Sequence, residues 1–218
     1  MRTLASALFT LSLLLAAVEA RAGDGERLLA ATHEEWQDLA EAIIGANAAA
    51  QGPDPLTTPM VLCEEAGCVQ TGAQALTPAE AARLRGLFAD GEDSPAAERT
   101  RIRKAIALYE TLIGTRNGTW RDHPGNEREY PDEPGQLDCI AESVNTLTYL
   151  SRLAHAGLLN HHQVGSFIHR YTVVLQHVAV DIVETGTEDR YAVDSWVGAN
   201  GEEPELLPYA DWRWEWGV

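Results

Sequence analysis

The chain has 218 residues, of which 45% are apolar, enough for one domain with its own hydrophobic core. It carries 33 acidic against 16 basic side chains, a net charge of −17. This sign argues against nucleic acids and anionic membranes as partners, because binding to phosphate requires the opposite charge.

The first residues are typical of a secretory signal peptide. Arg2 precedes an apolar run over residues 4–18, and the small residues of Val18-Glu19-Ala20 suit cleavage, with Ala20-Arg21-Ala22 as a second option. The run is shorter than the roughly 20 residues of a transmembrane helix. We expect residues 1–20 to be removed and the protein to be periplasmic or secreted in a bacterium, with no membrane span in its mature form. An uncleaved anchor is the alternative.

The next feature along the chain is a pair of cysteines. Cys63 and Cys68 flank Glu65-Ala66-Gly67, which can turn, so the sequence predicts a disulfide across a short hairpin. A zinc site is the weaker interpretation, because no second Cys or His pair stands at ligand spacing. The third cysteine, Cys139, then lies outside the disulfide, either as an inert buried residue or as a reactive thiol.

Helical patterns dominate residues 24–130. Apolar periodicity predicts one helix over 24–50, and Thr77-Pro78-Ala79-Glu80 has the N-cap, proline and glutamate of a second helix start. A third helix is expected from Ser94-Pro95 to Gly114. This region is therefore predicted to be mainly helical, with the Cys63–Cys68 hairpin inserted.

The segment from 115 to 136 is rich in Pro and Gly and predicts a long loop of the kind that often carries function. After it, Asp138 suits the N-cap of a helix over 139–156, which places Cys139 at the helix N-terminus. A further helix is expected over 161–170.

The periodicity then changes to that of strands. Residues 171–184 and 190–196 are rich in β-branched side chains and predict two strands joined by a turn. Trp212, Trp214 and Trp216 alternate as in a final strand or an aromatic flap. Helices followed by an antiparallel sheet predict an α+β fold.

One histidine and one aspartate stand out on these strands. His177 interrupts an apolar row on the first strand, and Asp194 lies on the second. Because side chains alternate between faces, a hairpin can bring the two side by side. A carboxylate beside an imidazole fixes its tautomer and stabilises its charged form.

The order Cys, His, Asp resembles the transglutaminase-like core, a relative of papain-type cysteine proteases. The matching segments are Gln136-Leu137-Asp138-Cys139, Gln176-His177-Val178-Ala179-Val180 and Tyr191-Ala192-Val193-Asp194-Ser195-Trp196. Ile140 stands where the family often has an aromatic residue, and Val178-Ala179 stands in place of Ala-Trp. The resemblance implies a catalytic core over 131–218, with a Cys-bearing helix packed on a small antiparallel sheet.

The same resemblance implies a chemistry. Cys139 is expected to attack a peptide or protein amide, His177 to hold the ion pair and protonate the leaving amine, and Asp194 to orient His177. Gln136 is a candidate donor to the oxyanion, beside the Cys139 N–H. No cofactor and no metal is expected, and both hydrolysis and transamidation stay open.

Other interpretations compete with this one. Cys139 could be a core residue of a catalytically inactive binding module on the same fold. Glu142, one turn after Cys139, would disfavour a thiolate if it is ionised and close. His162 and His169, seven residues apart, could share a helical face as metal ligands, but no acidic residue completes such a site. The oligomeric state is not predicted.

Overall fold

The computed structural model describes residues 36–50, 52–89, 91–125, 133–171 and 176–214. The predicted signal peptide lies outside these residues. The first part of the helix expected over 24–50 also lies outside them, and the described part is helical over 36–49. Contacts divide the chain into two compact units, residues 1–39 and residues 40–218. The second unit contains all the candidate site residues.

The first sheet of this unit has two antiparallel strands. It consists of β1 (Met60–Cys63) and β2 (Thr71–Gln74), joined through the short 3-10 helix η1 (Ala66–Cys68). The predicted disulfide between Cys63 and Cys68 is confirmed, with a Cα–Cα distance of 4.7 Å. Gly67 takes the left-handed conformation, φ 60°, that this tight connection requires.

Two helices follow with the caps that the sequence predicts. At the start of α2 (Pro78–Ala89), Glu80 N donates to Thr77 Oγ1 at 3.3 Å, and Thr77 N donates to Glu80 Oε2 at 2.8 Å. α3 (Pro95–Asn117) starts after Ser94 and ends three residues later than expected, at a left-handed Gly118. The expected loop after it contains a further 3-10 turn, η2 (Thr119–Arg121).

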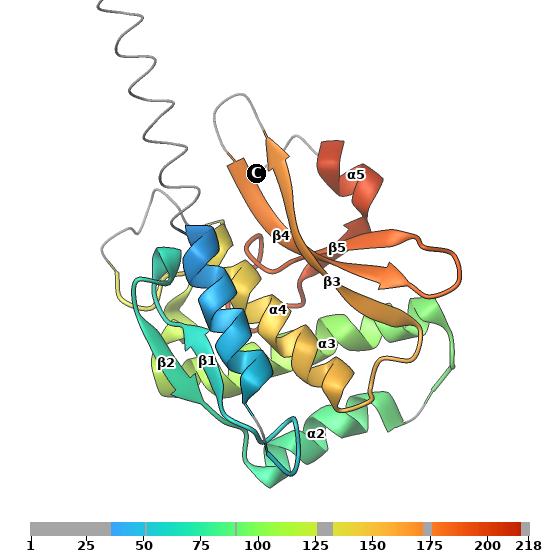
Figure 1. Ribbon diagram of the computed structural model, residues 1–218, viewed down its shortest axis with the longest axis horizontal. Helices are drawn as coiled ribbons and strands as arrows, with labels where there is room; N and C mark the ends of the chain where they lie inside the picture. The colour runs from blue at the N-terminus through green and yellow to red at the C-terminus, as the bar shows by residue number, and fades with distance from the viewer. Residues whose placement is uncertain (1–35, 51, 90, 126–132, 172–175, 215–218) are drawn as a thin grey trace, which may run out of the picture. The chain divides into compact units, whose positions relative to one another are not determined.

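The central helix is α4 (Cys139–His155), which contacts β1 on one side and β4 (Gln176–Glu184) on another (Figure 1). Its N-cap is Asp138, whose Oδ1 accepts from Ala141 N at 2.9 Å, as the sequence predicts. Buried side chains of α4 share one hydrophobic core with α3, with β1 and with β4. The core therefore joins residues from both sides of position 130.

The second sheet is a four-stranded antiparallel meander in the order β3 (His162–Tyr171), β4 (Gln176–Glu184), β5 (Arg190–Asp194) and β6 (Glu205–Pro208). Val180 and Ile182 of β4 belong to the core shared with α4. Ala179, on the opposite face, packs with Trp212 of the C-terminal helix α5 (Tyr209–Trp214). The two helices therefore cover opposite faces of the sheet, and the fold is α+β as expected.

The helix expected over 161–170 is wrong, because these residues form β3. Backbone pairing with β4 outweighs the local helical tendency. The pairing shifts between Val164 and Phe167, where Ser166 N donates to Asp181 Oδ1 at 2.7 Å. Gly165 lies in this bulge, because a Cβ there would collide with the Asp181 carboxylate.

Of two further expectations, one is confirmed in part and the other is corrected. The strand expected over 171–184 is confirmed over Gln176–Glu184, which is β4, whereas Tyr171 belongs to β3; residues 172–175 lie outside the described residues. The final strand or flap is wrong, because Trp212 and Trp214 lie on α5. The spacing of the three tryptophans at every second residue suggests a strand. It does not reveal that Trp212 packs on the sheet as part of a helix. Trp216 lies outside the described residues.

Candidate functional site

His177 and Asp194 lie on the face of the second sheet that carries Ala179 and Trp212, opposite to the face on which α4 packs. Asp181 of β4 pairs with Ala192 of β5. His177 lies an even number of residues from Asp181, and Asp194 lies an even number of residues from Ala192, so all four side chains share one face. His177 Nε2 and Asp194 Oδ2 are 2.6 Å apart. The pair is buried, with 6% of His177 and 1% of Asp194 exposed. The structure thus brings together two of the predicted site residues.

The hydrogen bond defines what each imidazole nitrogen can do. Because an ionised carboxylate only accepts, Nε2 carries the proton that it donates to Asp194. In the neutral ring the other nitrogen, Nδ1, then keeps its lone pair. His177 Nδ1 is buried and forms no hydrogen bond. Its imidazole is therefore oriented by a carboxylate, while Nδ1 lies buried without a hydrogen-bond partner, the Cys139 thiol included.

Two tryptophans enclose this pair. The ring centroid of His177 is 4.7 Å from that of Trp196 and 5.8 Å from that of Trp212. Trp212 Nε1 also donates to Asp194 Oδ2 at 2.8 Å. The Asp194 oxygen that faces His177 therefore accepts two hydrogen bonds inside an aromatic shell. Electrostatic interactions are stronger there than in water.

Cys139 is the first residue of α4 and keeps its thiol outside the disulfide, with 4% of the residue exposed. One hydroxyl connects its segment to that of His177. The Ser143 Oγ lies 2.6 Å from Cys139 O and 3.0 Å from Val178 O. The start of α4 and the start of β4, which carries His177, are thereby held next to each other.

The helix terminus supplies the electrostatic setting for the thiol. The Asp138 carboxylate satisfies the N–H of Ala141, and the first N–H groups of a helix have no acceptor within the helix. These groups and the helix dipole favour negative charge at this end.

Three buried carboxyl groups lie beside this helix start. Burial, reinforced by the charges of Glu110 and Asp122, raises the pKa of Glu142 well above its ordinary value. Burial likewise raises the pKa of Glu110 to about 8 and that of Asp122 to about 7. Burial therefore favours the neutral form of Glu142. A neutral Glu142 exerts no charge repulsion on a Cys139 thiolate.

The same carboxyl groups tie the surrounding segments together. Asp122 Oδ1 accepts from Leu137 N at 2.7 Å, two residues before Cys139. Glu110 Oε2 accepts from Gly201 N at 2.9 Å, in the segment after β5. Sequence reasoning did not single out Glu110 and Asp122. The one signal available in the sequence is that Glu110 adjoins the apolar stripe of α3.

Gln136 is also buried, and its side chain holds the loop before α4. Its Nε2 donates to Arg121 O at 2.8 Å, and its Oε1 accepts from His123 N at 3.2 Å. These contacts fix the turn at 121–123 against the residues that lead into Cys139. They give Gln136 a structural task, and its role as an oxyanion donor stays a prediction.

Two other histidines take part in structural pairs. His161 Nε2 lies 2.6 Å from Asp93 Oδ1, and His162 Nδ1 lies 2.9 Å from Glu98 Oε1. His162 and His169 lie on a strand, so the expectation of a shared helical face is wrong. Among the described residues, no group of three or more His, Cys, Asp or Glu side chains is arranged to hold a metal ion.

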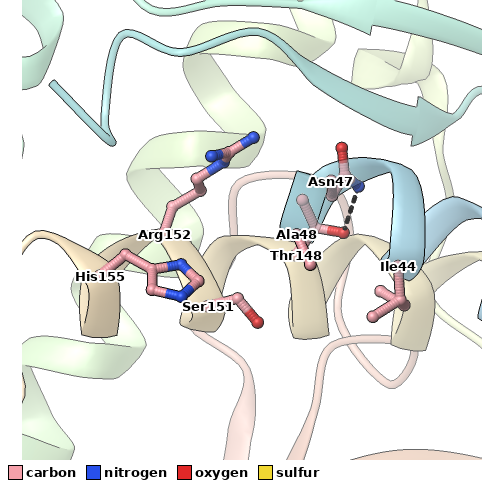
Figure 2. Close-up of a pocket in the computed structure, with 7 residues that line it drawn as sticks. All are labelled: Ile44, Asn47, Ala48, Thr148, Ser151, Arg152 and His155. Atoms are coloured by element: carbon pink, nitrogen blue, oxygen red, sulfur yellow. Dashed lines mark hydrogen bonds between the residues drawn. The ribbon is translucent and has the colours of Figure 1, made fainter. Parts of the chain in front are cut away.

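A small pocket lies further along α4, between its second half and residues 44–48 (Figure 2). Asn47 Nδ2 donates to Thr148 Oγ1 at 3.1 Å within it. Figure 2 shows the Arg152 side chain directed away from His155, and Arg152 Nη2 donates to Pro59 O at 2.9 Å. The pocket does not include Cys139 or His177, and its polar groups do not converge on a common point.

Comparison of the chain with protein families, with curated proteins and with solved structures finds no match. In the described parts of the chain, no helix combines the length and the apolar character needed to cross a membrane. A functional conclusion therefore depends on the geometry of the site itself.

Proposed function

We propose that the protein is a thiol-dependent acyl-transfer enzyme that cleaves or transfers an amide through Cys139, His177 and Asp194, on a papain-like or transglutaminase-like core. One observation carries the proposal. His177 is held by Asp194 through Nε2 at 2.6 Å, while its buried Nδ1 has no hydrogen bond. A helix with a cysteine at its N-terminus is attached to the same strand through Ser143.

In the proposed reaction the Cys139 thiol gives its proton to His177 Nδ1, and the thiolate attacks the carbonyl carbon of the amide. The tetrahedral intermediate places its negative charge on the former carbonyl oxygen. The Cys139 N–H and the Gln136 amide are the candidate donors to it. Nδ1 then returns the proton to the leaving amine and a thioester remains. Water releases the acid from the thioester, whereas an amine acceptor forms a new amide.

The surroundings of the pair suit this proton transfer. Asp194 stabilises the imidazolium that forms after His177 takes the proton. Trp196 and Trp212 shield the ring, which strengthens the electrostatic interaction between the carboxylate and the imidazolium. The raised pKa of Glu142 favours its neutral form, which leaves the thiolate without a like charge one turn away.

The environment of the enzyme is also part of the proposal. The Cys63–Cys68 disulfide fits an oxidising compartment, where such bonds form and persist. The proposal is that the protein acts in the periplasm or outside the cell, on a peptide or protein amide.

A second candidate function is a catalytically inactive binding module on the same fold. The observation in its favour is the 4% exposure of Cys139, because a substrate carbonyl has to reach the thiol. This alternative predicts that a peptide ligand binds without turnover and binds equally well when Cys139 is replaced by Ser.

The experiment that separates these functions uses the protein without residues 1–20 and a library of peptide amides, with and without an added primary amine. Mass spectrometry of the products distinguishes hydrolysis from transamidation. We expect turnover in the wild-type protein and only background turnover in Cys139→Ser, which changes one atom of the side chain. Equal turnover by both proteins would exclude Cys139 as the nucleophile. Binding without turnover would support the binding module.

A further inference from the structure

Asp194 has an unusual distribution of hydrogen bonds. Its Oδ2 accepts from both His177 Nε2 and Trp212 Nε1, at 2.6 Å and 2.8 Å, while its buried Oδ1 accepts none. The direction of the carboxylate towards His177 therefore depends on a second donor that comes from a different element. That donor is supplied by α5, near the C-terminal end of the described residues.

Trp212 is itself fixed at several points. It is 0% exposed and packs with Ile168 and Ala179 on the sheet. Arg170 Nη1 donates to Trp212 O at 3.1 Å, and the guanidinium carbon of Arg170 lies 4.9 Å from the indole centroid. The indole N–H thus reaches Asp194 from a side chain with little freedom to move, as preorganisation of a site requires.

The titratable and charged groups around the pair come from three elements. The Asp194 charge contributes to the raised pKa of Glu142 on α4, Arg170 of β3 lies against Trp212, and Asp194 itself lies at the end of β5. Glu142 and Arg170 do not donate to Asp194 Oδ2 in any described hydrogen bond. The indole N–H and the imidazole N–H are therefore its two donors among the described contacts.

We propose that Trp212 is a positioning residue for the proposed reaction: its indole N–H holds Asp194 Oδ2 towards His177 Nε2, which keeps Nδ1 unprotonated and ready to accept the thiol proton. The inference rests on the proposed function. Packing alone does not explain why a tryptophan stands at this position. The aromatic contacts of Trp212 need no N–H, whereas the hydrogen bond to Asp194 Oδ2, the oxygen that also binds His177, requires one.

The test removes the indole N–H of Trp212 and keeps an aromatic side chain at this position. In Trp212→Phe, and in a protein with benzothienylalanine at position 212, the donor is lost; the second replacement preserves the size of the indole and so protects folding. Trp214→Phe is the matched control, because Trp214 lies on the same helix and is 66% exposed. The first readout is the rate of Cys139 alkylation by iodoacetamide near neutral pH, followed by mass spectrometry. The second is the ¹⁵N NMR signal of His177, which reports its tautomer.

We expect both donor-free proteins to alkylate Cys139 about tenfold more slowly than the wild type, the loss expected for one charge-assisted hydrogen bond. Their His177 signals should show a mixture of tautomers, whereas Trp214→Phe should match the wild type in both readouts. An unchanged rate and an unchanged tautomer in the benzothienylalanine protein would overturn the role of Trp212 alone. If Cys139 in the wild type reacts no faster than it does in His177→Gln, the proposed function fails instead.

Discussion

Replacing Glu110 by Gln should make the protein more stable at alkaline pH. Burial raises the pKa of Glu110 to about 8 from the ordinary value of 4.5. The folded protein therefore keeps a proton that the unfolded chain releases between these values. Stability falls as pH rises across this interval, because the unfolded state binds fewer protons than the folded state. The contribution is fully present below pH 4.5 and is lost at about pH 8.

The magnitude follows from the width of this interval. Each pH unit corresponds to about 1.4 kcal/mol per titrating group, so the raised pKa of Glu110, to which the neighbouring Asp122 charge contributes, corresponds to on the order of 4–5 kcal/mol between acid and alkaline conditions. The amide side chain of the Glu110→Gln protein does not titrate, keeps an oxygen for Gly201 N and removes this loss. For a protein of this size, about 4 kcal/mol corresponds to a change of roughly 8–16 °C in Tm.

The assay is urea denaturation at about pH 5, 6.5 and 8, with Glu41→Gln as the control because Glu41 is exposed on the helix over 36–49. The wild type and the control should lose stability by a few kcal/mol from the lowest to the highest pH, and Glu110→Gln should lose clearly less. A wild-type protein whose stability is level or rises over this range would refute the buried, protonated carboxyl group. A Glu110→Gln protein with the wild-type slope would refute it as well.

Two other predictions concern the segments that position Cys139. Replacing both Cys63 and Cys68 by Ser should lower the free energy of unfolding by about 2 kcal/mol, because the disulfide closes a short loop; unchanged urea denaturation would contradict this. Asp138→Ala should cost about 1 kcal/mol through loss of the α4 N-cap, and a circular dichroism melt identical to that of the wild type would show that the cap to Ala141 N is unimportant.

Helix starts could be predicted because their signals are local. Thr77 and Glu80, Ser94 and Asp138 all bond to backbone groups within three residues, so the pattern that identifies each cap also specifies its contacts. The pairing of His177 with Asp194 could be anticipated for a related reason. Both residues lie on adjacent strands, where alternation between faces restricts the possible neighbours.

The remaining features depend on contacts between residues distant in sequence. β3 could not be separated from a helix because the Asp181 carboxylate, which binds Ser166 N at its bulge, comes from the next strand. Trp212 reaches Asp194 only after α5 packs on the sheet. Glu110, Asp122 and Glu142 come from separate segments, and their raised pKa values arise only when folding buries them together.

The pH dependence of Cys139 alkylation by iodoacetamide, in the wild type and in His177→Gln, tests the proposed nucleophile most directly and requires no substrate. The wild-type rate should reach its half-maximum at least about one pH unit below the ~8.5 of an ordinary thiol. In His177→Gln the half-maximum should return towards ~8.5, with a rate about tenfold lower near neutral pH. Equal rates in both proteins, with a half-maximum at or above ~8.5, would contradict the assignment of Cys139 and His177 as a catalytic pair.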